Sequence, residues 1–315
     1  MRRWLRRGFS VLSVAVAAPI GLYAAASFYV TGKALRDRFT PGTEPYQGTA
    51  WCETCHAEHV RQWKTSLHSQ ARTLDFKPLH LMRTRACYSC HGFEDANEGV
   101  SCEICHGPGH TAQTDFGEMP LCVRCHADEN PLTGTGVMVT VDEWLGSRAH
   151  AEGQSCTTCH MPLVEHADAP MHFHGFYGNV RHPEIYPGKV RIADLRVEAG
   201  RALVSVENTV TGHFMPTGCP SKFIELVVTG EDASGRPVYT ERRVFQRQMN
   251  RFMSEVRDDT RLRDGERREL AFALPEKLER VKATLRLYPS DLWAGGRGRI
   301  IELDERATAP YPQDP

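Results

Sequence analysis

The sequence predicts a multidomain chain: an N-terminal transmembrane helix, a mostly α-helical and irregular middle domain, and a C-terminal all-β, immunoglobulin-like sandwich. Three observations predict this order. A long uncharged stretch lies near the N-terminus, ten of the 11 cysteines fall within residues 52–159, and short alternating segments fill residues 189–306. We expect the boundaries at residues 1–40, 41–187 and 188–308.

The N-terminal segment has four arginines within residues 2–7, followed by 23 residues without charge, Gly8–Val30. At about 1.5 Å per residue, a helix of this length measures roughly 34 Å, enough to cross a bilayer. A cleaved signal peptide is the alternative, because Ala24–Ala26 offers small residues for cleavage. In both cases the arginines stay in the cytoplasm. We therefore expect a protein anchored in the inner membrane and facing the periplasm, or exported to the periplasm or extracellular space.

The overall charge excludes one class of function. The chain carries 38 basic and 39 acidic side chains and has a net charge of -1. Binding to nucleic acid needs a strongly basic surface, so we expect no nucleic-acid partner.

Five Cys-x-x-Cys-His motifs occupy the middle domain, whereas chance predicts about 0.02 in a chain of this composition. Two thiols at this spacing reach the vinyl groups of one porphyrin, and the following histidine supplies the proximal nitrogen to iron. Disulfides or zinc sites explain the pattern less well, because each cysteine pair carries its own adjacent histidine. We therefore expect five covalently attached haem c groups. Their attachment residues are Cys52, Cys55, Cys87, Cys90, Cys102, Cys105, Cys122, Cys125, Cys156 and Cys159, and their proximal iron ligands are His56, His91, His106, His126 and His160.

The sixth iron ligand decides what each haem does. A second histidine leaves the iron no vacancy, so the haem only passes electrons, whereas an open position binds a small molecule. Ten histidines lie outside the motifs, enough to supply five distal ligands: His59, His68, His80, His110, His150, His166, His172, His174, His182 and His213.

Four pieces of the middle domain carry a family resemblance. They are Trp63-x-x-Ser66-x-His68, Gly99-Val-Ser-Cys102-Glu-Ile-Cys105-His106-Gly-Pro-Gly, Trp144-x-x-Ser147-x-x-His150 and Cys156-Thr-Thr-Cys159-His160-Met-Pro. The first and third also form a weak internal repeat. Together they resemble the superfamily of cytochrome c554 and the multihaem nitrite and hydroxylamine oxidoreductases, over about half of the chain. The resemblance implies that His68, His110, His150 and either His174 or His172 are distal ligands.

One departure from that superfamily bears on activity. The nitrite reductases that this chain resembles carry a Cys-x-x-Cys-Lys catalytic haem, and the sequence contains no such motif. The resemblance therefore assigns no catalytic residue.

The C-terminal domain is predicted from short period-two segments separated by Gly, Asp and Pro turns, which are typical of an antiparallel sandwich. The segments are 190–197, 202–206, 223–228, 238–240, 268–274 and 283–287, the last of which closes the series. Asn208–Gly218 resembles an element of sandwich domains fused to multihaem cytochromes. We expect His213 within it to be a distal ligand that reaches back to a haem. A loop histidine bonded to the backbone is the alternative.

These features predict electron transfer through five haems, mostly with two histidine ligands. One alternative is a multihaem oxidoreductase whose open haem acts on a small nitrogen or sulfur compound. Another is a membrane-anchored quinol dehydrogenase. The expected partners are redox proteins, the membrane and its quinol, and a second copy of the chain.

Overall fold

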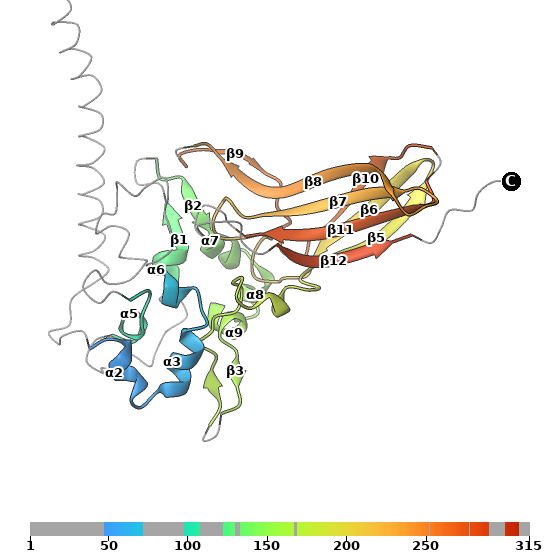
Figure 1. Cartoon of the computed structure of the whole chain (residues 1–315). Coiled ribbons are helices and arrows are strands. Elements are labelled where there is room, and N and C mark those ends of the chain that lie inside the picture. Colours follow the sequence, from blue (N-terminus) through green and yellow to red (C-terminus); the bar gives the residue numbers. More distant parts are fainter. Residues whose placement is uncertain are drawn as a thin grey trace, which may run out of the picture.

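The computed structural model describes residues 47–71, 98–107, 122–129, 133–166, 169–251, 253–276, 278–289 and 300–308 (Figure 1). The expected membrane helix, the motif at Cys87–His91, and His80 and His110 lie outside these residues. Within them, no helix has the length and apolar character needed to cross a membrane.

The motif region (residues 47–187) consists of short helices joined by irregular segments. The helices are α2 Thr49–Glu53, α3 Ala57–Trp63, α5 Cys102–His106, α6 Val123–His126, α7 Thr140–Leu145, α8 Arg148–Ala151 and α9 Cys156–His160, with 3-10 turns at His68–Gln70 and Pro183–Ile185. Two small antiparallel pairs add β1 Ala127–Glu129 with β2 Gly136–Val139, and β3 Leu163–Val164 with β4 Met171–His172. The expectation of short helices with little strand is confirmed for the described residues.

The two-sheet region (residues 188–308) contains two antiparallel sheets. The smaller has the order β10-β6-β5, with β5 at Val190–Glu198, β6 at Arg201–Asn208 and β10 at Arg267–Ala273. The larger has the order β12-β11-β7-β8-β9, with β7 at Phe223–Glu231, β8 at Pro237–Met249, β9 at Val256–Asp259, β11 at Arg280–Tyr288 and β12 at Ile301–Ala307.

Both sheets contribute to one apolar core, because alternate residues of each strand point inward. Val204 and Phe272 of the smaller sheet belong to the same buried cluster as Ile224, Phe245 and Leu285 of the larger one. The expectation of a C-terminal β-sheet region is therefore confirmed. Its immunoglobulin-like type stays a prediction.

Two strands were not foreseen. The segment at 283–287 does not close the series, because β12 follows it and pairs with β11. Only Ile301 and Leu303 of β12 are buried, so its alternation is short. Every residue of β9 is exposed at the edge of the sheet, so this strand has no apolar period.

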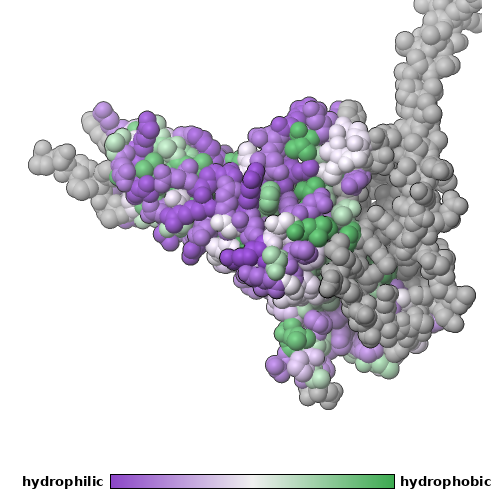
Figure 2. All heavy atoms as spheres, turned by 180° about the vertical axis from the view of Figure 1, so that it is seen from behind, coloured by the Kyte–Doolittle hydropathy of each residue, from purple (hydrophilic) through white to green (hydrophobic). Residues whose placement is uncertain are grey.

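The two regions meet at one end of the sheets. In Figure 1, α7 and α8 lie beside this end, while α2, α3 and α5 lie farther away. The backbone N–H of Ala149 in α8 donates to the carbonyl of Thr211 (2.9 Å), which joins the regions directly. Figure 2 shows a mostly hydrophilic surface over the two-sheet region on the face that it presents.

Candidate functional site

Each described Cys-x-x-Cys-His motif forms a single helical turn. The backbone N–H of His56 donates to the carbonyl of Cys52, and that of His126 to the carbonyl of Cys122, each over 2.9 Å. Such a turn places both thiols and the imidazole on the same side of the backbone. No described motif cysteine is in a disulfide, so the thiols are available for covalent attachment.

Thiols from different motifs touch in two places. Cys52 is hydrogen bonded to Cys102, and Cys122 to Cys156. Burial, with the neighbouring Cys102 thiol, raises the pKa of Cys52 to about 12. The hydrogen bond with Cys156, together with burial, raises the pKa of Cys122. Groups attached to the first and third motifs are therefore neighbours, as are those attached to the fourth and fifth.

Three motif histidines each face a histidine from elsewhere in the chain across nearly the same distance. The ring centroids are 6.2 Å apart for His68 and His126, 6.3 Å for His106 and His174, and 6.2 Å for His160 and His213. Because the three pairs have the same spacing and each contains one motif histidine, we expect them to bind the same kind of group.

This spacing fits a metal ion held between two imidazoles. A metal–imidazole bond is about 2.0 Å long, and the bonded nitrogen lies about 1.1 Å from its ring centroid. An ion bound axially by two rings therefore separates their centroids by about 6.3 Å. No cluster of three or more His, Cys, Asp or Glu side chains that could hold a metal ion occurs in the part of the chain that the structure describes. A porphyrin iron needs only two axial protein ligands, so the pairs fit haem.

Backbone carbonyls fix the tautomer of three of these rings. Nδ1 of His160 lies 2.5 Å from the carbonyl oxygen of Tyr177. Nδ1 of His174 lies 2.6 Å from that of His172, and Nδ1 of His213 lies 2.9 Å from that of Phe214. A carbonyl only accepts, so Nδ1 carries the proton and Nε2 keeps its lone pair for a metal. A second hydrogen bond of this kind orients metal-binding histidines in general.

Desolvation of the rings favours the neutral form of the paired imidazoles, which binds metal, although His106 and His126 are exposed as whole residues. It lowers the pKa of His68 to about 3 and those of His126, His174 and His213 to about 4. It also lowers the pKa values of His106 and His160.

The pairs differ in the angle between their rings. The planes of His160 and His213 are 19° apart, and those of His106 and His174 are 24° apart. The planes of His68 and His126 are 70° apart. Two pairs are therefore nearly parallel and one is closer to perpendicular.

The internal repeat corresponds to a repeated set of hydrogen bonds. The indole N–H of Trp63 donates to the carbonyl of Val100 (2.7 Å), and that of Trp144 to the carbonyl of Gln154 (3.0 Å). Each acceptor lies two residues before the first cysteine of a motif. The following serine in each copy donates to the tryptophan carbonyl over 2.7 Å. Each tryptophan thus holds the start of a haem-binding turn.

Two glycines make room for the paired rings. A Cβ on Gly99 would lie 2.1 Å from the backbone oxygen of His68, which Val100 also contacts through its N–H (2.8 Å). Gly178 has a φ of +97°, and a Cβ there would lie 2.8 Å from the ring of His160. Larger residues at either position would displace a paired histidine.

The other expected histidines lie elsewhere. His150 is exposed and packs edge-on against Trp144, with centroids 4.4 Å apart. His172 is exposed, and its Nδ1 contacts the carbonyl of Met161 (2.6 Å). The ring of His56 lies 5.5 Å from that of His59, at an angle of 87°. None of these contacts has the spacing of the three pairs.

Sequence reasoning missed three charged residues near the site. Glu143 and Arg261 form a buried ion pair at 2.5 Å beside the loop that carries His213. The charge of Lys222 acts on His126, His160 and His213. Nothing in the local sequence pattern distinguishes these residues from surface charges.

Comparisons with known proteins match this chain to cytochromes. The family model described as cytochrome c3 matches residues 94–172. Cytochrome c-554 of Nitrosomonas europaea is 28% identical over 170 residues, which are 45% of this chain and 66% of that protein, so the chain spans slightly less than two thirds of this relative. The structure of a penta-heme cytochrome c552 from Thermochromatium tepidum matches with a TM-score of 0.63 and 19% identity, covering 83% of this chain and 98% of that one.

Proposed function

Because the chain is a multihaem c-type cytochrome, we propose that it transfers electrons through five covalently attached haem c groups. The observation that carries this proposal is the set of three histidine pairs at 6.2–6.3 Å. Haem iron supplies reversible one-electron chemistry when bound, and two histidine ligands leave it no position for a substrate.

The pairs support one distal ligand for each of three haems. The haem on His106 takes His174, the haem on His126 takes His68, and the haem on His160 takes His213. The other two expected distal ligands, His110 and His150, stay predictions without an assigned haem. The division into residues 1–40, 41–187 and 188–308 is part of the same proposal, with the sandwich of immunoglobulin-like type.

The thiol contacts support a path for electrons. Cys52 is hydrogen bonded to Cys102 and Cys122 to Cys156, so haems attached at each of these two pairs of motifs would be neighbours. Haems that meet edge to edge exchange electrons without protein rearrangement.

The proposed compartment is extracytoplasmic. Covalent haem attachment and the apolar segment near the N-terminus support export, with the chain either held at the inner membrane or released. Redox proteins, membrane quinol or a second copy of the chain would then be its partners. Cell fractionation of the full-length chain tests the anchor: protein that remains with membranes after a salt wash supports it, and protein in the periplasmic fraction supports release.

Electron paramagnetic resonance of the purified, fully loaded protein tests the proposed function. We expect low-spin signals that account for every haem and do not change with nitrite, hydroxylamine or sulfite. A high-spin haem that responds to one of these compounds would instead support the oxidoreductase alternative.

A further inference from the structure

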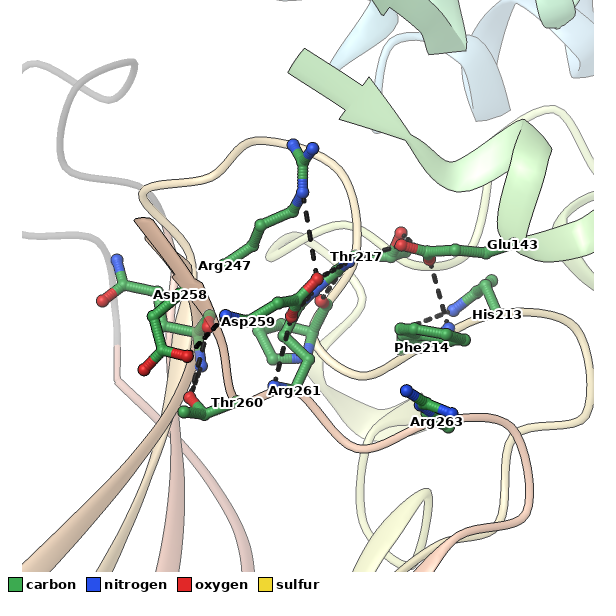
Figure 3. A network of polar contacts seen from close by, with 12 residues as sticks. Glu143, His213, Phe214, Thr217, Arg247, Asp258, Asp259, Thr260, Arg261 and Arg263 are labelled. Atoms are coloured by element: carbon green, nitrogen blue, oxygen red, sulfur yellow. Dashed lines mark hydrogen bonds and ion pairs between the residues drawn. The ribbon is translucent and has the colours of Figure 1, made fainter. Parts of the chain in front are cut away.

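A buried ion pair crosses the boundary between the two regions. Glu143 lies on α7 in the motif region, and Arg261 lies between β9 and β10 in the two-sheet region. Their side chains are 5% and 4% exposed, and Oε1 of Glu143 lies 2.5 Å from Nη1 of Arg261 (Figure 3). Burial raises the pKa of Glu143, and the charge of Arg261 with the hydrogen bonds that Glu143 accepts acts against that shift.

The second oxygen of Glu143 holds the His213 loop (residues 209–218). Oε2 accepts from the hydroxyl of Thr217 (2.7 Å) and from the backbone N–H of Phe214 (3.2 Å). These contacts flank a short stretch that begins directly after His213. The carboxylate of Glu143, from the motif region, is therefore hydrogen bonded to the loop that carries His213.

Arg261 holds the same stretch from the other side. Its guanidinium lies over the ring of Phe214, 5.2 Å from the centroid, and Nη1 donates to the carbonyl of Pro216 (3.4 Å). Asp259 accepts two hydrogen bonds from Arg261, at 2.8 and 2.7 Å, which fix the direction of the guanidinium. Both partners of the ion pair therefore contact the same stretch of the loop.

The beginning of the loop is held from both regions, because the backbone N–H of Ala149 in α8 donates to the carbonyl of Thr211 (2.9 Å). The side-chain amide of Asn208, which is fully buried, donates to the carbonyl of His213 (3.3 Å) and to that of Arg263 (2.9 Å). Asn208 fixes the loop relative to the two sheets. Glu143 fixes the loop relative to α7, which precedes α8 and the fifth motif in the chain. Glu143 therefore sets the distance between His213 and His160 together with two other contacts from the motif region, Ala149 with Thr211 and Thr140 with Thr217.

We propose that Glu143 and Arg261 form an interdomain clasp that positions His213 as the sixth ligand of the haem on His160. This inference rests on the proposed ligation by His213. A ligand on a loop from another domain binds iron only while the loop is held in place, since an unrestrained loop spends conformational entropy on each binding event. The clasp removes that cost by holding the loop before the bond forms.

Carbon monoxide binding by the reduced, full-length, haem-loaded protein tests the clasp, because the gas takes only an open or weakly held position. We expect Glu143→Gln and Arg261→Gln each to bind up to one equivalent per chain, whereas the unmodified protein binds none at the haem on His160. Thr217→Val, which keeps the shape of the side chain but loses the hydroxyl, should show the same gain if the charge variants load poorly with haem.

Thr135→Val is the matched control. The hydroxyl of Thr135 in the motif region donates to the carbonyl of Ser254 in the two-sheet region (2.8 Å), so it crosses the same boundary as Thr217 but makes no described hydrogen bond to the His213 loop. We expect this variant to bind no additional carbon monoxide. Equal binding by Thr135→Val and the clasp variants would overturn the proposal, because the effect would then come from loosened domains in general.

His213→Ala distinguishes a failure of the clasp from a failure of the proposed ligation by His213. It should bind one equivalent, and adding Arg261→Gln to it should give no further binding. Binding by His213→Ala but not by Glu143→Gln, Arg261→Gln or Thr217→Val would overturn the clasp and leave the ligation standing. No change with His213→Ala would overturn the ligation itself, and the clasp with it.

Discussion

His160 and His213 lie with ring centroids 6.2 Å apart and planes 19° apart, although one ends α9 and the other lies in a loop between β6 and β7. Each ring binds a backbone carbonyl through Nδ1, so both Nε2 atoms are left for a metal. The two-sheet region therefore contributes to the proposed haem site, and its role extends beyond that of an appended docking module.

The ring angles predict distinct magnetic signals. Nearly parallel axial imidazoles separate the d-orbital energies of ferric iron, whereas nearly perpendicular ones leave two orbitals close in energy and make the signal highly anisotropic. We expect the haem on His126, whose rings lie at 70°, to give the highly anisotropic signal, and the haems on His106 and His160 to give ordinary rhombic ones. His68→Ala should remove the anisotropic signal alone. Its loss in His174→Ala instead would contradict the assignment.

His174 and His172 provide a direct comparison of two nearby histidines. The resemblance allowed either one as a distal ligand, but only His174 faces a motif histidine at the pair spacing. We expect His174→Ala to convert one haem per chain from low-spin to high-spin, and His172→Ala to convert none. Visible absorption and magnetic circular dichroism give the count. Conversion by His172→Ala would show that the loop presents the other imidazole.

Lys222 should raise the potentials of two haems. Its charge acts on His126 and His160, and burial lowers the pKa of Lys222 itself. A nearby cation disfavours ferric iron, and one charge close to a haem is worth about 1 kcal/mol, or roughly 40 mV for one electron. We expect Lys222→Gln to lower both potentials by about that amount in a redox titration. The exposed Lys189, replaced in the same way, should leave them unchanged.

The clasp should lose stability in acid through Asp259. Burial disfavours its charge, but hydrogen bonds from Arg261 and the positive charge there outweigh burial and hold the pKa of Asp259 below its ordinary value. The unfolded chain then binds more protons between the two pKa values, so stability is full above the ordinary one and is lost as pH falls through the lowered one. Asp259→Asn should cost about 1 kcal/mol at pH 7.

Urea unfolding at two pH values checks this effect. The difference between Asp259→Asn and the unmodified protein should be full at pH 7 and smaller at pH 3, below the ordinary aspartate pKa of about 3.9 and closer to the lowered pKa of Asp259. An equal difference at both values would mean that the substitution acts through packing, without the carboxylate charge.

Local sequence patterns predicted the parts of the molecule whose chemistry is local. A Cys-x-x-Cys-His motif is one helical turn, so the positions of the thiols and of His160 follow from spacing alone. The alternation in β5, β6, β7 and β11 likewise reflects one buried face. The edge strand β9 has no buried face and so leaves no apolar period.

The rest depends on contacts between distant segments. The pairing of His126 with His68, and the choice of His174 over His172, are set by how the motif region packs. The buried ion pair of Glu143 and Arg261 joins residues 118 positions apart. The residues next to these histidines and charges in the sequence do not predict which distant residue they contact, because those contacts form only in the folded chain.

Iron anomalous diffraction from crystals of the haem-loaded protein tests the central claim most directly. The three histidine pairs predict an iron atom midway between the rings of His106 and His174, of His126 and His68, and of His160 and His213. Iron atoms at these three midpoints are the expected result. An iron bound to His106, His126 or His160 but paired with any other side chain, or left without a protein ligand on its far side, would contradict the account.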